Sequence, residues 1–399
     1  MRNTPRYLKL LPVLALFAAL GSAQAETSPG GSISGGYGGL TWTASSTLTG
    51  TTNTQAGGPV PNGGDPIYWP VYPRDSGVVQ LLMNYGAGGS FICSGTLLGD
   101  RRSILTAGHC VSDGAGTANP LSTTVYFQPP GGLPAGTRIF DGVTLLPNGG
   151  AVTRSVDGYF VNSGYTGDVI DKNDIAVLRM STLAPDWALS YDLYEANDLQ
   201  GKTFMVEGYG RLGDGATGAN NFATRLRNGD NRYDIRLGDP DFGTDWSVVL
   251  GEPMDQIDEV WMSDFDNGLA ANDTACLVTT AGLGLAASPK YCNTGLGARE
   301  VGVAGGDSGG PQFIGSLISG VNSFGLTFGR TFGDFYCVPT PTSSGCLNSS
   351  FGEFSGYVPT YLHTAFIRAS MVPEPASLAL LALGLLALAT VHRRRSVRS

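Results

Sequence analysis

One serine of this sequence has neighbours that are typical of a nucleophile. Ser308 lies in the stretch Gly306-Asp307-Ser308-Gly309-Gly310-Pro311. A serine hydroxyl is a weak nucleophile unless a neighbouring base takes up its proton. Flanking glycines permit a tight turn and bring backbone N–H groups close to a reacting carbonyl. The stretch therefore indicates acyl-transfer chemistry, while a purely structural glycine-rich turn remains the alternative for so short a pattern.

Two other motifs contain a candidate base and a candidate partner for it. His109 lies in Thr106-Ala107-Gly108-His109-Cys110, and Asp174 precedes the apolar stretch Ile175-Ala176-Val177-Leu178. A buried aspartate needs a hydrogen-bond donor, and a histidine N–H is a suitable one. A structural histidine and a solvated turn aspartate are the alternatives. Zinc binding at His109 is disfavoured because no further histidine and cysteine residues have zinc-like spacing.

Together the three motifs resemble those of the trypsin/chymotrypsin-like serine peptidases, over residues 77–370. The resemblance implies an all-β fold with two six-stranded antiparallel β-barrels and a short C-terminal helix. His109 and Asp174 are then expected on the first barrel and Ser308 on the second, with the site between them. Closed barrels also suit a composition with 59 glycines and many turn residues.

The resemblance also implies a role for each residue of the motifs. His109 takes the proton of Ser308 and later delivers it to the leaving amine, while Asp174 holds the imidazole tautomer. The backbone N–H groups of Gly306 and Ser308 form the oxyanion hole. This chemistry requires no metal ion and no organic cofactor, and its partner is a peptide or protein substrate.

The residues that match the primary specificity pocket carry no negative charge. By resemblance the base of this pocket is Gly302, followed by Val303, so a Lys or Arg side chain has no carboxylate to pair with. We expect an apolar or small residue at the site of cleavage. Ser323-Phe324-Gly325 resembles the segment that pairs with the substrate backbone. Ala304 replaces the cysteine whose disulfide usually braces the pocket.

The six cysteines are expected to form disulfides because the even number occurs in an exported chain. The resemblance implies the pairs Cys93–Cys110 and Cys276–Cys292, which leaves Cys337–Cys346 as a local loop bridge.

Two segments precede the region of resemblance. Residues 1–25 have a basic start, an apolar run and the small-residue motif Ala23-Gln24-Ala25, which together indicate a secretory signal peptide. Residues 26–76 are rich in Gly, Ser, Thr and Pro, and we interpret them as a loose arm.

The segment 371–399 combines Pro373-Glu374-Pro375, the apolar residues 376–391 and a cluster of arginines. This combination resembles the PEP-CTERM sorting signal of Gram-negative bacteria. It implies processing by an exosortase-type enzyme and delivery to the cell surface or the extracellular matrix. The apolar run is expected to form a transmembrane helix that anchors the chain in the inner membrane, transiently or permanently.

The net charge of the chain is −9, and an acidic surface argues against nucleic acid as a partner. The region between Gly210 and Cys276 is longer than the resemblance predicts. Its acidic residues allow calcium binding, but solvated acidic loops are the favoured interpretation because EF-hand spacing is absent. These residues are Asp255, Asp258, Glu259, Asp264 and Asp266.

The leading hypothesis is a secreted serine endopeptidase, and two alternatives remain. An esterase orders its triad Ser, Asp, His, and would need His363 or His392 as its base. A non-catalytic surface or matrix protein could instead retain a peptidase scaffold. No Ile-Val-Gly-Gly start precedes the region of resemblance, so an activation cleavage that frees an amine to pair with Asp307 remains open.

Overall fold

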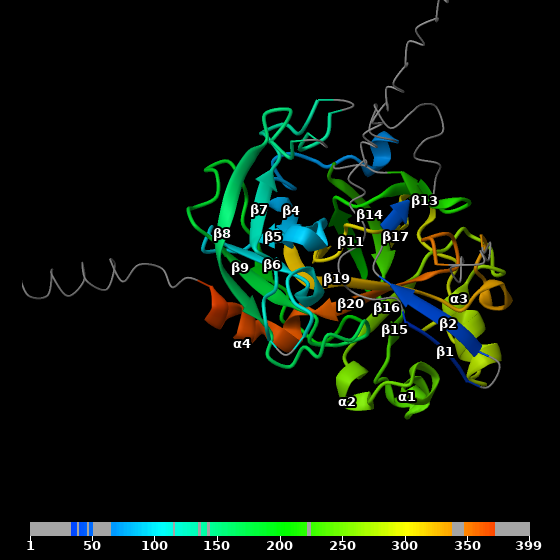
Figure 1. The fold of residues 1–399 in the computed structure, drawn as a ribbon. Helices are drawn as coiled ribbons and strands as arrows, with labels where there is room; N and C mark the ends of the chain where they lie inside the picture. The colour runs from blue at the N-terminus through cyan, green and yellow to red at the C-terminus, as the bar shows by residue number, and fades with distance from the viewer. Residues whose placement is uncertain are drawn as a thin grey trace, which may run out of the picture.

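The computed structural model describes residues 33–37, 40–45, 48–50 and 65–371, except 115, 135–136, 142–143, 222–224 and 337–346 (Figure 1). The expected signal peptide, the sorting segment from residue 372 onward and the Cys337–Cys346 pair lie outside these residues. Among the residues described, no helix is both long and apolar enough to cross a bilayer.

The first half of the fold is a closed six-stranded barrel in the order β4-β5-β6-β9-β8-β7. Every neighbouring pair is antiparallel, and Leu81 of β4 pairs with Cys93 of β5 and with Val125 of β7. These strands contain runs of apolar and β-branched residues that fill the barrel interior. The strands are β4 (Val78–Asn84), β5 (Ser90–Leu97), β6 (Ser103–Thr106), β7 (Ser122–Phe127), β8 (Val152–Val161) and β9 (Ala176–Met180).

The second half is built on a ten-stranded sheet with the main order β14-β11-β18-β19-β20-β16-β15. A four-stranded sheet, β13-β12-β3-β17, lies beside it. The predicted all-β fold and its first six-stranded barrel are confirmed, but in the described residues the second half is an open half-barrel and not a second closed six-stranded barrel, because added strands extend its sheet. The strands are β10 (Asp192–Leu193), β11 (Thr203–Gly208), β12 (Leu212–Asp214), β13 (Gly218–Asn221), β14 (Arg227–Arg232), β15 (Ile235–Arg236), β16 (Trp261–Asp264), β17 (Val301–Val303), β18 (Pro311–Ile314), β19 (Leu317–Thr327) and β20 (Phe354–Pro359).

The segment that the composition predicts as a loose arm contains three strands, β1 (Ile33–Tyr37), β2 (Leu40–Ser45) and β3 (Leu48–Gly50). β2 pairs with β19, and β3 pairs with β17 and β12. Backbone hydrogen bonds hold such added strands, and Leu40 of β2 also inserts its side chain into a buried apolar cluster of the second half. Strands β2 and β3 therefore belong to the second half of the fold.

The long insertion also has structure of its own. It contributes the short helices α1 (Asp245–Leu250) and α2 (Met254–Ile257), and Trp246 of α1 packs edge-on against Phe242 and tilted against Phe328. These rings belong to a separate buried apolar cluster. Part of the insertion therefore extends the core instead of forming solvated loops.

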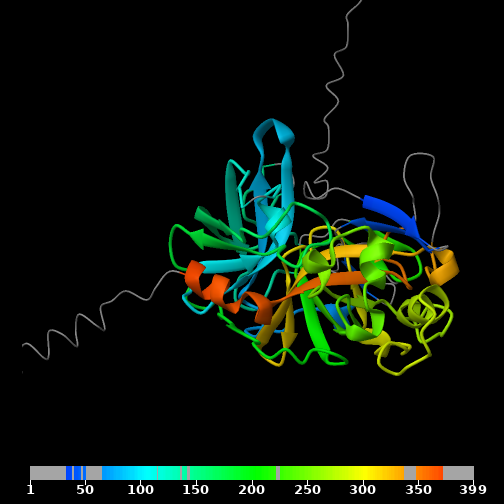
Figure 2. The same ribbon diagram turned by 90° about the horizontal axis from the view of Figure 1, so that it is seen from below.

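The closing helix α4 (Thr360–Ser370) joins the two halves. Figures 1 and 2 both place α4 against the first barrel, although β20, which precedes it, lies in the second half. His363 of α4 donates from Nε2 to the carbonyl of Lys172 at 2.7 Å, and its Nδ1 accepts from the amide of Asn162 at 3.1 Å. Both ring nitrogens of His363 are thus occupied, and burial lowers its pKa.

Candidate active site

The register of the first barrel brings His109 and Asp174 together. His109 lies in the turn of 3₁₀ helix Gly108–Cys110 that follows β6, and Asp174 lies just before β9. β6 and β9 are antiparallel partners with Thr106 opposite Ala176, so the end of one strand adjoins the start of the other. The Cys93–Cys110 disulfide ties the histidine turn to β5 and confirms the predicted pairing.

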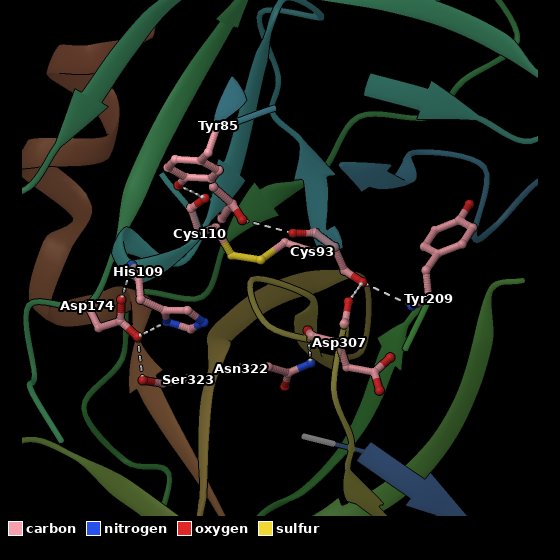
Figure 3. Close-up of a disulfide and its surroundings, with 12 residues drawn as sticks. Tyr85, Cys93, His109, Cys110, Asp174, Tyr209, Asp307, Asn322 and Ser323 are labelled. Atoms are coloured by element: carbon pink, nitrogen blue, oxygen red, sulfur yellow. Dashed lines mark hydrogen bonds and ion pairs between the residues drawn. A yellow bond between two sulfur atoms is a disulfide. The ribbon is translucent and has the colours of Figure 1, made fainter. Parts of the chain in front are cut away.

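Asp174 accepts three hydrogen bonds, which meet at its carboxylate in Figure 3. Oδ1 accepts from the backbone N–H of His109 at 2.7 Å, and Oδ2 lies 2.7 Å from its Nδ1. Ser323 donates its hydroxyl to Oδ2 at 2.5 Å. A carboxylate is an acceptor only, so Nδ1 carries the proton and Nε2 of the neutral ring has a free lone pair. Nε2 is buried and has no partner among the described residues.

Ser308 is held by the first barrel, although it lies between β17 and β18 of the second half. Its carbonyl accepts from the backbone N–H of Ser94 at 2.7 Å. The hydroxyl of Ser94 donates to the carbonyl of Gly306 at 2.9 Å. The structure has no hydrogen bond between Ser308 and Nε2 of His109. Such bonds are often long in enzymes without substrate, so both groups remain candidates for proton transfer.

The turn around Ser308 leaves two N–H groups free. No hydrogen bond in the described part of the chain uses the backbone N–H of Gly306 or Ser308, whereas the next N–H, of Gly309, donates to the carbonyl of Asn322 at 2.8 Å. Gly306 has φ +102°, and a Cβ there would lie 2.9 Å from Ile92. Only glycine fits this conformation and this space. The two free N–H groups match the expected oxyanion donors.

Asp307 has a buried carboxylate that points away from the His109–Asp174 pair (Figure 3). Its Oδ1 accepts from the N–H of Gly210 at 2.7 Å, and its Oδ2 has no hydrogen-bond partner. Burial raises its pKa well above the usual range, and the positive charge of Arg227 opposes that shift. Arg227 and Asp307 line the same cavity of about 20 Å³, and the Arg227 guanidinium lies 5.0 Å from the ring centre of Tyr68.

Gly302 and Val303, the predicted pocket residues, lie in β17, where Gly302 pairs with Thr49 of β3. A Cβ on Gly302 would meet the ring of Phe265 at 3.1 Å. Glu353 accepts from the backbone N–H groups of residues 348, 349 and 350, at 2.9 to 3.0 Å. The carboxyl group of Glu353 is therefore held by the backbone of its own loop and is not directed at Gly302 by any hydrogen bond of the described residues.

The three residues of the expected substrate-pairing segment, Ser323-Phe324-Gly325, make different contacts in the structure. Ser323 directs its hydroxyl to Asp174, and Phe324 pairs with Gly356 of β20. Gly325 pairs with Ser355 on one side and with Ser45 of β2 on the other. Strand β2 thus occupies the edge that a substrate would need at Gly325, and the expected substrate contact there has no free edge in this structure.

Several contacts of the site were missed by sequence reasoning. Ser94 clamps the Ser308 turn, and its position directly after Cys93 was the available signal. The hydroxyl of Ser323 as a third donor to Asp174 and the proximity of Arg227 to Asp307 had no local signal. The Cys276–Cys292 bridge, in contrast, was predicted and is confirmed.

The family model that matches this chain covers the segment that holds His109 and Asp174, but not Ser308. Residues 71–232 match the model of the trypsin family, and residues 372–395 match the PEP-CTERM protein-sorting motif. No curated protein sequence matches the chain.

Two solved structures illustrate its structural neighbours. Protease Anisep from Arthrobacter nicotinovorans has 16% identity and a TM-score of 0.41, covering 74% of this chain and 95% of its own. HL collagenase has 17% identity and a TM-score of 0.44, covering 76% of this chain and 96% of its own. These matches give the chain a segment similar to the trypsin family over residues 71–232 and a PEP-CTERM protein-sorting motif, which indicates a secreted, surface-directed protein.

Proposed function

We propose that this protein is a secreted serine endopeptidase that uses His109, Asp174 and Ser308 as its catalytic triad. The observation that carries the proposal is the bonding of His109. Asp174 fixes the proton on Nδ1, and the buried Nε2 has no partner. A neutral imidazole in this tautomer is prepared to accept the proton of a serine hydroxyl.

In the proposed reaction, the Oγ–H proton of Ser308 moves to Nε2 of His109 as Oγ bonds to the peptide carbonyl carbon. The resulting oxyanion accepts from the N–H groups of Gly306 and Ser308. The C–N bond then breaks, and His109 returns the proton to the leaving amine. Water repeats the sequence on the acyl-enzyme, releases the carboxylic acid and restores Ser308.

The proposed specificity is for apolar or small side chains rather than Lys or Arg. Gly302 supplies no charge, and the ring of Phe265 lies against it. A buried cation without a partner is costly, so a substrate lysine or arginine would bind such a pocket poorly.

We further propose that the chain is anchored in the inner membrane of a Gram-negative bacterium before an exosortase-type enzyme processes it. The sorting motif supports this route. Residues 376–391 supply the apolar anchor, and the arginines that follow them are expected to stay in the cytoplasm.

The test compares hydrolysis of an internally quenched peptide library by the wild-type protein and by Ser308→Ala. We expect cleavage by the wild type and loss of cleavage in the variant, with Ser316→Ala as an exposed serine control in the same half. Absence of cleavage by the wild type on every peptide would favour the non-catalytic surface protein. Cleavage of aryl esters alone would favour the esterase.

A further inference from the structure

A group of three buried carboxylates lies in the second half of the fold, apart from the proposed triad. Asp264 ends β16, Asp266 follows two residues later, and Asp273 caps the N-terminus of α3 (Thr274–Leu277). Their side chains are buried, with residue exposures of 1%, 3% and 4%. One carboxylate oxygen of each lies within 4.8 Å of those of the other two.

Two of these carboxylates have an oxygen with no partner. Asp264 uses Oδ2 to accept from the N–H of Ala275 at 2.7 Å, and Asp273 uses Oδ1 to accept from the N–H of Cys276 at 2.9 Å. Oδ1 of Asp264 and Oδ1 of Asp266 are buried without a hydrogen bond. Buried ionised groups normally have a counter-charge, and no ion pair of the described residues includes any of these three aspartates.

Further carboxylates add to the negative charge of this group. Glu300 accepts from the backbone N–H of Asp266 at 2.7 Å. Asp234, between β14 and β15, adds another carboxyl group, and its Oδ1 lies 3.6 Å from a guanidinium nitrogen of Arg232. Burial and the neighbouring carboxylates raise the pKa values of Asp264 and Asp266. Arg232 pairs with Asp234 and also favours the ionised form of Asp273, whereas no ion pair of the described residues includes Asp264 or Asp266.

The other acidic residues of the insertion differ from this group. Asp255 is exposed on α2, Asp258 pairs with Lys172 at 2.8 Å, and Glu259 pairs with Arg236 at 2.9 Å. The sequence expectation of solvated acidic side chains thus holds for Asp255 and is wrong for Asp264 and Asp266. The acidic side chains at the surface of the insertion are solvated or paired, whereas the carboxyl groups of Asp264 and Asp266 are buried and form no ion pair in the described residues.

We propose that Asp264, Asp266 and Asp273 bind a calcium ion. All three offer oxygen, which is the ligand of hard cations, and none offers the nitrogen or sulfur that favours zinc or copper. Calcium lies about 2.3–2.6 Å from each ligand, so two of its oxygens can be about 5 Å apart. Magnesium holds several waters in a strict octahedron, which suits a buried three-carboxylate site less well.

The proposed ion lies beside the residues of the specificity pocket. Phe265 sits between Asp264 and Asp266 in the chain, and its ring forms the surface that Gly302 contacts. Asp273 leads into Cys276, which is bridged to Cys292. The calcium ion would fix the position of Phe265 beside Gly302. It would do so in a pocket where Ala304 replaces the cysteine of the usual bracing disulfide. This consequence rests on the proposed function, whereas binding of the ion does not.

The test is thermal unfolding of the purified secreted protein after chelator treatment, with calcium chloride or magnesium chloride added back. At a hundredfold excess over the dissociation constant we expect calcium to raise Tm by roughly 5 °C or more. Asp266→Asn should remove the rise. Because this variant removes a buried carboxyl group that has no counter-charge, it should be at least as stable as the wild type in chelator, which separates lost binding from misfolding. Asp255→Asn should retain the full rise.

Three results would overturn the calcium site. They are an identical wild-type Tm in chelator and in calcium, a full calcium-dependent rise in Asp266→Asn, and an equal rise with magnesium. For the pocket, calcium removal should raise KM for a peptide while kcat changes little. If the protein hydrolyses no peptide, the proposed function fails, and the unfolding experiment still decides the ion site.

Discussion

The two halves of the molecule treat a buried carboxylate in opposite ways. Asp174 of the first barrel accepts three hydrogen bonds at 2.5 to 2.7 Å, two of them from His109. Asp307 of the second half accepts one, from Gly210, and has an oxygen without a partner. The register of β6 and β9 brings His109 to Asp174, whereas Asp307 is positioned by the turn that precedes β18. In the proposed mechanism, the proton-transfer pair therefore depends on strand register, whereas the turn that carries the proposed nucleophile depends on contacts of a less fully bonded carboxylate.

This comparison predicts its largest effects at the triad. Ser308→Ala or His109→Ala should each lower kcat/KM by roughly 10⁴- to 10⁶-fold, because each removes a participant in proton transfer. The double variant should be no worse than either single variant, since the residues act as a unit. Peptide hydrolysis measures the loss, and circular dichroism should show an unchanged fold. Near-wild-type turnover in Ser308→Ala would contradict the assignment of Ser308 as the nucleophile.

The next effect is expected at Arg227, the basic residue whose charge favours the ionised form of the buried Asp307. Arg227→Met should lower the free energy of unfolding by roughly 1–3 kcal/mol, because the buried Asp307 loses the positive charge that favours its ionised form. It should also lower kcat by displacing the turn that carries Ser308. Urea unfolding measures the first effect. The control is Arg179→Met, which breaks a surface pair with Asp157 at 2.7 Å and should cost no more than about 1 kcal/mol. Equal losses in both variants would contradict the account of Asp307.

The third prediction concerns the side chains that the proposed pocket around Gly302 prefers. A peptide library should show apolar or small residues before the scissile bond. Gly302→Ala should shift the preference further toward small residues, because the added Cβ lies 3.1 Å from Phe265. A profile dominated by Lys and Arg would show that another carboxylate reaches the pocket.

The smallest effect concerns the contact between the halves at His363. Burial lowers the pKa of His363 in the folded protein below the unfolded value of 6.5. At a pH between the two values, His363 therefore binds a proton in the unfolded chain but not in the folded one. Stability should therefore be present above about pH 6.5 and fall as the pH drops below it, by at most about 1.4 kcal/mol per pH unit. Urea unfolding at pH 7.5 and 5.5 should show a smaller pH dependence in His363→Gln. An equal pH dependence in both proteins would assign the effect to other groups.

The parts of the site that the sequence predicted are those carried by short contiguous motifs. His109, Asp174 and Ser308 each have their own turn signal, and the barrel register then brings the first two together. The Cys93–Cys110 and Cys276–Cys292 pairs follow the same pattern.

The remaining features depend on contacts between distant segments, so no local signal reveals them. β3 joins β17 through backbone groups, which a Gly- and Thr-rich sequence does not mark as a strand. Asp264 and Asp266 have the sequence surroundings of solvated loop residues, and only the packing of the insertion buries them. Ser323 lies in the substrate-pairing motif while its hydroxyl bonds to Asp174, across 149 residues of chain.

The proposed triad requires that His109, held by Asp174, activate Ser308 and no other serine. Its most direct test is to react the protein with a fluorophosphonate and to locate the adduct by peptide mass spectrometry. We expect an adduct on Ser308 of the wild-type protein, and loss of that adduct in His109→Ala. An adduct on a different serine, or undiminished labelling of Ser308 without His109, would contradict it.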